Sequence, residues 1–292
     1  MQKTWLLVLA LALFACTPNA GPNDASDATA EPGAMPIPAG AFRFVPQIES
    51  SAKLVDVTIS PGGLLAAVSG ANGTVRVWDL RSSLLYRTLE RAPAAGFVGP
   101  ETLAFLEPDA IGLIDVTTGE RRRVASGQKA SWLATAPANV VVGAYSDTSE
   151  LVVWDVERDA KRWSAPLPGE VDALALAPDG SSVAVAVGSS IHLLGADGTA
   201  HVITDPEGKL PERDFRHLAF AKTGDKLLAL RIVEATVWDT RKRTLIRRFD
   251  RAAAAAFTPD GEELIVTGQM TSFKAGQGAM RRYALTTGEQ TG

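Results

Sequence analysis

Few residues of this chain are placed for covalent or acid–base chemistry. Cys16 is the only cysteine among 292 residues, so neither an intramolecular disulfide nor a multi-cysteine metal site can form. The three histidines, His192, His201 and His217, are far apart in the sequence and lack the spacing of a zinc site. The chain has no Gly-x-Ser-x-Gly elbow, no Walker loop and no His-Glu-x-x-His helix. We therefore expect a non-enzymatic protein that needs no metal and no cofactor.

Cys16 ends a segment that is typical of an exported protein. Lys3 precedes an apolar run over residues 5–15, which is shorter than the ~20 residues that span a bilayer but matches the core of a signal peptide. Residues 13–16, Leu-Phe-Ala-Cys, resemble the lipobox of bacterial lipoproteins, although Phe14 is larger than the usual residue there. The resemblance implies that residues 1–15 are a lipoprotein signal peptide and that Cys16 begins the mature chain and carries lipid, palmitate included. The alternative is an ordinary signal peptide in which Cys16 is incidental.

The residues after Cys16 predict a tether. Residues 16–40 are rich in Pro, Ala, Gly, Asn and Asp and have no apolar periodicity, so we expect them to be disordered. A flexible chain of this length reaches roughly 25–30 Å. Thr17, rather than Asp, follows the cysteine, and by resemblance to enteric lipoproteins this implies the outer membrane, facing the periplasm.

Two markers repeat along the rest of the chain. Trp-Asp pairs occur at residues 78–79, 154–155 and 238–239, about 80 residues apart, and weaker copies at 114–116, 193–195 and 283–285 complete a period of ~40–45 residues. Turn sequences such as Ala-Pro-Asp-Gly at 177–180 and Thr-Pro-Asp-Gly at 258–261 precede these positions in phase. Together the markers resemble the WD-repeat family of β-propellers.

This resemblance implies an all-β fold. We expect one propeller over residues 41–292 with six four-stranded blades, seven being the alternative count. The first blade should place strands at 54–59, 64–69, 75–80 and 84–89. By resemblance, residues 41–47 should supply the outer strand of the last blade and close the ring. The Gly-His dipeptide of the family is absent, so its Asp-His-Ser-Trp network cannot form and stability should depend more on apolar packing.

Most polar residues of the repeats have a structural interpretation. Asp79, Asp115, Asp155 and Asp239 recur by repeat position, which favours a role in the blades over acid–base chemistry. The first strand of each repeat has small residues, except that Trp132 and His217 stand where the other repeats have Asp56, Ala95, Ala173 and Ala254. We expect Trp132 and His217 to fill space between blades, with lining of the central channel as the alternative; Trp163, in an outer strand, should also pack between blades.

Two insertions indicate where a partner could bind. Residues 205–214 lengthen the connection between the fourth and fifth repeats, and residues 269–278 lengthen a hairpin in the sixth; both belong to the same face of a propeller. The candidate partner-binding residues are on or beside them: Lys209, Glu212, Arg213, Asp214, Arg216, His217, Phe273, Lys274 and Gln277.

The sequence thus favours a binding function in the bacterial cell envelope. The net charge of -4 argues against nucleic acid as a partner. We expect a membrane-anchored propeller scaffold that binds an envelope protein. The alternative is a periplasmic hydrolase or lyase, or a small-ligand sensor, which would use the central channel near Arg216 and His217.

Overall fold

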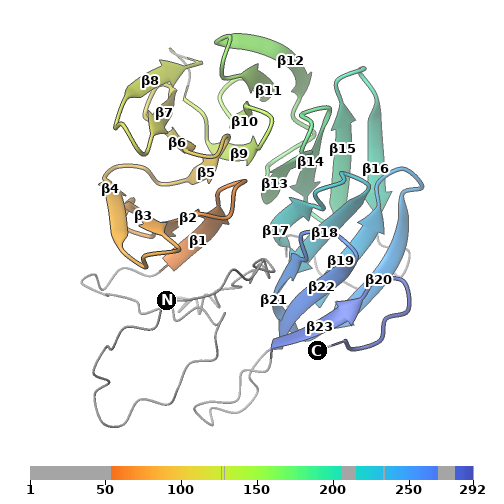
Figure 1. Cartoon of the computed structure of the whole chain (residues 1–292). Helices are drawn as coiled ribbons and strands as arrows, with labels where there is room; N and C mark the ends of the chain where they lie inside the picture. Colours follow the sequence, from red (N-terminus) through yellow and green to blue (C-terminus); the bar gives the residue numbers. More distant parts are fainter. Residues whose placement is uncertain are drawn as a thin grey trace, which may run out of the picture.

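The computed structural model describes residues 54–125, 127, 129–204, 215–232, 234–268 and 280–291, which form six antiparallel sheets arranged as the blades of a β-propeller (Figure 1). The predicted fold class and the count of six blades are confirmed. The first three sheets contain β1 (Leu54–Ile59), β2 (Leu65–Gly70), β3 (Val75–Asp79) and β4 (Leu85–Leu89); β5 (Ala95–Phe97), β6 (Thr102–Leu106), β7 (Ile111–Asp115) and β8 (Arg121–Val124); and β9 (Trp132–Ala136), β10 (Val140–Tyr145), β11 (Glu150–Asp155) and β12 (Ala160–Pro166).

The other three sheets follow the same order. They contain β13 (Ala173–Leu176), β14 (Ser182–Val187), β15 (Ser190–Gly195) and β16 (Ala200–Thr204); β17 (Phe215–Phe220), β18 (Lys226–Arg231), β19 (Glu234–Asp239) and β20 (Thr244–Asp250); and β21 (Ala252–Phe257), β22 (Glu263–Gly268) and β23 (Met280–Ala284). Each strand pairs with its neighbour in sequence, and we designate the strands of a sheet a to d in chain order. No helix within the described residues is long and apolar enough to cross a membrane.

The a–b turns have the chemistry that their sequences predict. Gly63, Gly180, Gly224 and Gly261 have φ between 69° and 74°, a conformation that glycine adopts without a steric penalty. In the turn of the fourth sheet the Gly180 N–H donates to the Ala177 carbonyl at 2.9 Å. Pro178 fixes φ at the preceding corner, so these short sequences direct the chain back into strand b.

The recurring aspartates stabilise the c–d turns. The four residues are Asp79, Asp115, Asp155 and Asp239. In each, one carboxylate oxygen accepts hydrogen bonds of 2.7–3.1 Å from the backbone N–H groups two and three residues later. Hydrogen bonds to the carboxylate favour its charged form, so they lower the pKa of Asp79 and Asp155 through backbone donors and that of Asp115 first through Thr117. The structural interpretation of these residues is confirmed.

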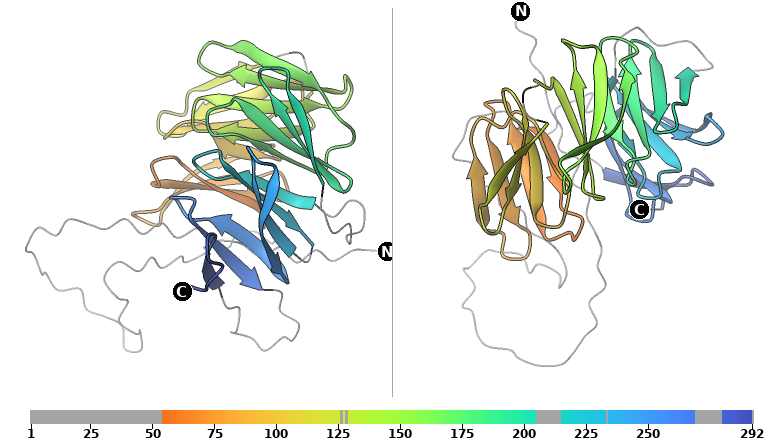
Figure 2. Two further views of the ribbon diagram at one scale, coloured as in Figure 1. Left: turned by 90° about the vertical axis from the view of Figure 1, so that its right-hand side faces the viewer. Right: turned by 90° about the horizontal axis from the view of Figure 1, so that it is seen from above.

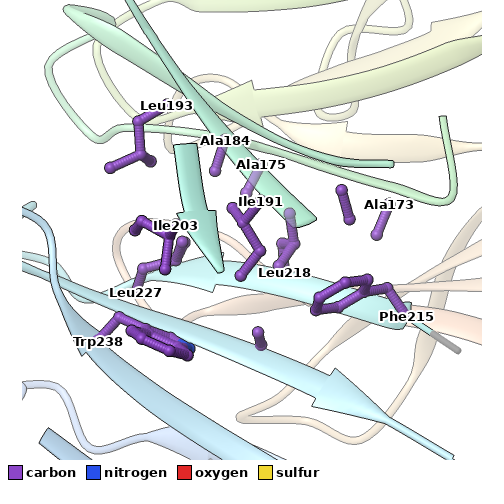
Figure 3. Close-up of a cluster of buried hydrophobic side chains, with 12 residues drawn as sticks. Ala173, Ala175, Ala184, Ile191, Leu193, Ile203, Phe215, Leu218, Leu227 and Trp238 are labelled. Carbon is purple, nitrogen blue, oxygen red and sulfur yellow. The ribbon is translucent and has the colours of Figure 1, made fainter. Parts of the chain in front are cut away.

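The core is divided among the junctions of neighbouring sheets. Figure 3 shows the cluster between the fourth and fifth sheets, to which Ala173 and Ala175 of β13, Leu218 of β17 and Trp238 of β19 all belong. The small side chains of strand a allow the sheets to approach closely near the axis. The Trp238 indole donates to Thr236 Oγ1 at 2.9 Å, a bond within its own strand.

Trp163 confirms the prediction that it packs between blades. It lies against the apolar cluster that joins the third and fourth sheets, and its indole N–H donates to the Gly180 carbonyl at 3.1 Å. Similar clusters join the first sheet to the second, the second to the third and the fifth to the sixth. Within the described residues, no such cluster joins the sixth sheet to the first.

Within the described residues, the sixth sheet has three strands and each of the others has four. Beyond β23 the chain turns back, so that Tyr283 pairs with Gln290 and the Thr291 N–H donates to the Arg282 carbonyl at 2.8 Å. These residues begin a fourth strand without completing it. Residues 41–47 lie outside the described residues, so the predicted closing strand stays a prediction.

The two faces of the ring have different connections (Figure 2). On one face the d–a and b–c loops bond to each other, as where the Ala92 N–H donates to the Gly73 carbonyl at 2.7 Å. On the other face the a–b and c–d turns form hydrogen bonds with each other; for example, the Leu80 N–H donates to the Leu64 carbonyl at 2.8 Å. We refer to the first as the d–a face. The strands that flank the two predicted insertions, β16 and β17 and then β22 and β23, have their adjoining ends at this face, while residues 205–214 and 269–278 themselves lie outside the described residues.

Candidate functional site

A cavity of about 1340 Å³ occupies the centre of the ring. The innermost strands β1, β5, β9, β13, β17 and β21 supply its wall, together with the turns at their two ends. Much of the wall is apolar, because strand a is where the repeats have small residues: Ala95, Ala134, Ala173, Ala175, Ala219 and Ala255 are among the lining residues.

The mouth on the a–b side is formed by turn residues. Pro61, Pro137, Pro178 and Pro259 come from four of the a–b turns, and Lys222 takes the proline position in a fifth. Proline offers no backbone N–H donor, and its role in these turns is to fix φ. The polar groups that line the cavity at this end include Ser60, Thr258 and Lys222.

The mouth on the d–a face is polar and aromatic, and we refer to its residues as the charged mouth: Asp56, Arg91, Lys129, Trp132, Arg216 and His217. Asp56, Trp132 and the Arg216–His217 pair lie at the beginnings of β1, β9 and β17, while Arg91 and Lys129 come from d–a loops. All six side chains are exposed. Strands that begin at the same face of a ring bring these distant parts of the sequence together.

The prediction that Trp132 and His217 fill space between blades is wrong. Both line the cavity, and Trp132 is 37% exposed. Strand pairing confirms that they are equivalent to Asp56, because each is opposite the fifth residue of its strand b: Asp56 opposite Ser69, Trp132 opposite Ala144 and His217 opposite Leu230. In the second sheet the equivalent residue is Ala94, one residue before the predicted Ala95, since the Leu106 N–H bonds to the Ala94 carbonyl.

Asp56 and His217 have opposite pKa shifts from one main cause. The ring wall surrounds both side chains although each reaches the water of the cavity, and this desolvation disfavours their charged forms. It raises the pKa of Asp56 and lowers that of His217. Their mutual attraction opposes both shifts, so the two groups are close enough to interact electrostatically. A neutral imidazole can accept or donate a proton.

The other charges of the cavity are mainly positive. Within the part of the chain that the structure describes, Arg91 and Lys129 form no ion pair. Glu107 also lines the cavity, but its carboxylate forms an ion pair with Arg123 at 2.6 Å. Asp56 is therefore the described acidic group at this mouth whose carboxylate is not taken up by such an ion pair.

Of the predicted partner-binding residues, the structure describes two, Arg216 and His217. Arg216 and His217 lie at the charged mouth, as the channel hypothesis requires. Lys209, Glu212, Arg213, Asp214, Phe273, Lys274 and Gln277 lie outside the described residues, as does Cys16. Sequence reasoning missed Arg91 and Lys129 and gave Asp56 no functional role. For Asp56 there was a signal, since a carboxylate at the small-residue position of strand a is as exceptional as Trp132 or His217.

Neither a scan of protein-family models nor a search of curated proteins finds a match to this chain. Within the described residues, no cluster of three or more His, Cys, Asp or Glu side chains could hold a metal ion.

Proposed function

We propose that this chain is a non-enzymatic, WD-repeat-like propeller of the bacterial cell envelope, held to a membrane by lipid on Cys16, and that its d–a face binds a protein partner. The observation that supports this most is the concentration of charged and aromatic side chains at one mouth of the cavity, on the d–a face. Trp and Arg contribute disproportionately to binding energy in protein interfaces.

Site-specific photo-crosslinking in intact cells tests the proposed face. A photoreactive residue at Ser131 lies just before β9, at the charged mouth, and one at Ala138 lies just after β9, at the opposite face. Both positions are exposed and belong to one sheet, so Ala138 is a matched control. We expect a defined crosslinked product from position 131 and none from position 138. Equal products from both positions, or none from 131, would contradict the proposal.

A small-ligand sensor or a hydrolase or lyase is the second candidate, and the Asp56–His217 pair supports it. Opposite pKa shifts in neighbouring groups are typical of acid–base sites. A fragment screen by thermal shift separates the two candidates, because a small ligand bound in the cavity should raise the melting temperature of the wild type but not that of Asp56→Asn with His217→Gln. Absence of such ligands, together with the crosslink at position 131, would favour the protein partner.

A further inference from the structure

The charge of the mouth is opposite to that of the chain. The protein carries a net charge of -4, yet Arg91 and Lys129 both lie where the cavity opens on the d–a face. Among the described acids that line the cavity there, Glu107 is paired with Arg123, and Asp56 is the other. Positive charge concentrated in a low-dielectric concave opening attracts anions more strongly than the same charges would on a flat surface.

Trp132 adds a second recognition element beside these cations. When the first strands of the six repeats are aligned, four of them have alanine or aspartate at the position of Trp132. Trp132 is 37% exposed and is therefore not packed between sheets. An exposed indole at the rim of a cavity offers a flat apolar surface for an aromatic or aliphatic side chain. The mouth thus combines a surface for an apolar group with cations for negative charges.

We infer that the charged mouth binds an acidic peptide segment of the partner, with an apolar or aromatic residue of that segment against Trp132 and its carboxylates near Arg91 and Lys129. The inference rests on the proposed function and specifies the chemistry of its partner. The cavity of about 1340 Å³ exceeds the ~300–1,000 Å³ typical of small-molecule sites, so its opening on the d–a face has room for a peptide segment.

Binding of defined peptides to the purified mature chain tests this inference. The probe is a fluorescently labelled peptide of sequence Glu-Glu-Phe-Glu-Glu, with Lys-Lys-Phe-Lys-Lys as the charge-reversed control and glutarate as a small dicarboxylate competitor. We expect the acidic peptide to bind and the basic one not to bind, and we expect the affinity to fall as salt rises, because exposed ion pairs are screened.

Charge-reversal variants locate the site. Lys129→Glu should weaken binding roughly 5–10-fold, whereas Lys222→Glu, which makes the same change at the opposite mouth, should alter it less than 2-fold. Trp132→Ala should weaken binding by a similar factor and Trp132→Phe should restore most of it. Circular dichroism of each variant confirms that the fold is kept.

Three outcomes would overturn the inference: no binding of the acidic peptide, equal effects of Lys129→Glu and Lys222→Glu, or displacement of the peptide by glutarate at concentrations that indicate a small-molecule site. The photo-crosslink at position 131 distinguishes these failures from failure of the proposed function. A crosslinked partner without peptide binding would reject only the acidic chemistry, and absence of the crosslink would reject the docking face itself.

Discussion

At the scale of single residues, His217 links protonation to stability. Its pKa is lowered in the folded protein, so the unfolded chain binds the proton first as the pH falls through ~6.5. The stability associated with neutral His217 is therefore complete above this pH and is lost on acidification. Asp56 acts in the opposite direction, because its pKa is raised and protonation relieves the desolvation cost of its carboxylate.

We therefore expect two variants to change the pH dependence with opposite signs. His217→Gln should reduce the fall in melting temperature between pH 7.5 and 5.5, since no imidazole must then be protonated on unfolding. Asp56→Asn should increase this fall, because removing the carboxylate removes the attraction that holds the pKa of His217 up. Differential scanning fluorimetry at several pH values measures both. Changes of the same sign in the two variants would show that the groups are not coupled as described.

Cys16 allows a test of the anchor that is independent of the propeller. Lipid chains contribute about 0.8 kcal/mol per buried CH₂ to membrane binding, so Cys16→Ser should remove nearly all of the membrane-bound fraction. The variant should be either soluble in the periplasm or retained uncleaved. Fractionation, gel mobility and metabolic labelling with a palmitate analogue measure the outcome. Normal processing with wild-type membrane association would mean that Cys16 is not lipidated.

At the scale of elements, the c–d turns depend on one side chain each. Asp115 accepts hydrogen bonds at 2.8 Å from the N–H groups of both Thr117 and Thr118, in the manner of a helix N-cap. Asp115→Ala should therefore cost about 0.5–2 kcal/mol, the range for losing such a cap, and lower the melting temperature by a few degrees. Asp109→Ala in the same sheet is the control, since it removes only an exposed ion pair with Arg123. Equal losses in the two variants would contradict this role for the turn aspartates.

The strands were predictable from the sequence where neighbouring residues, such as those of a turn, fix where a strand begins and ends. The turn sequences and Trp-Asp pairs place β1 at Leu54–Ile59 as found, and β2 begins at Leu65, one residue later than predicted. The charged mouth was not predictable in the same way. Arg91 and Lys129 come from loops without a repeated pattern, and whether Trp132 faces a neighbouring blade or the channel depends on the width of a ring formed by residues far apart in sequence.

At the scale of the whole molecule, the ring has one junction unlike the others. Apolar clusters join each sheet to the next from the first to the sixth, but within the described residues none joins the sixth to the first. Among the described residues, Glu289–Thr291 pair with the outer edge of β23 at one end, and Met280 at the other end of β23 is 43% exposed. An incomplete edge strand offers unpaired backbone groups to another segment.

We expect residues 41–47 to be that segment, so deleting them should destabilise the whole domain. Phe42, Phe44 and Val45 could each contribute up to ~1.5–3 kcal/mol if fully buried, although alternate residues of an outer strand face opposite sides and not all can be. A loss of a few kcal/mol is a large share of a typical stability of ~5–15 kcal/mol and should lower the melting temperature by ~5–10 °C. Deleting residues 17–34 is the matched control, because a tether that packs on nothing should leave the melting temperature unchanged. Equal melting temperatures for the two deletions would refute closure by the N-terminal segment and leave β23 as a free edge.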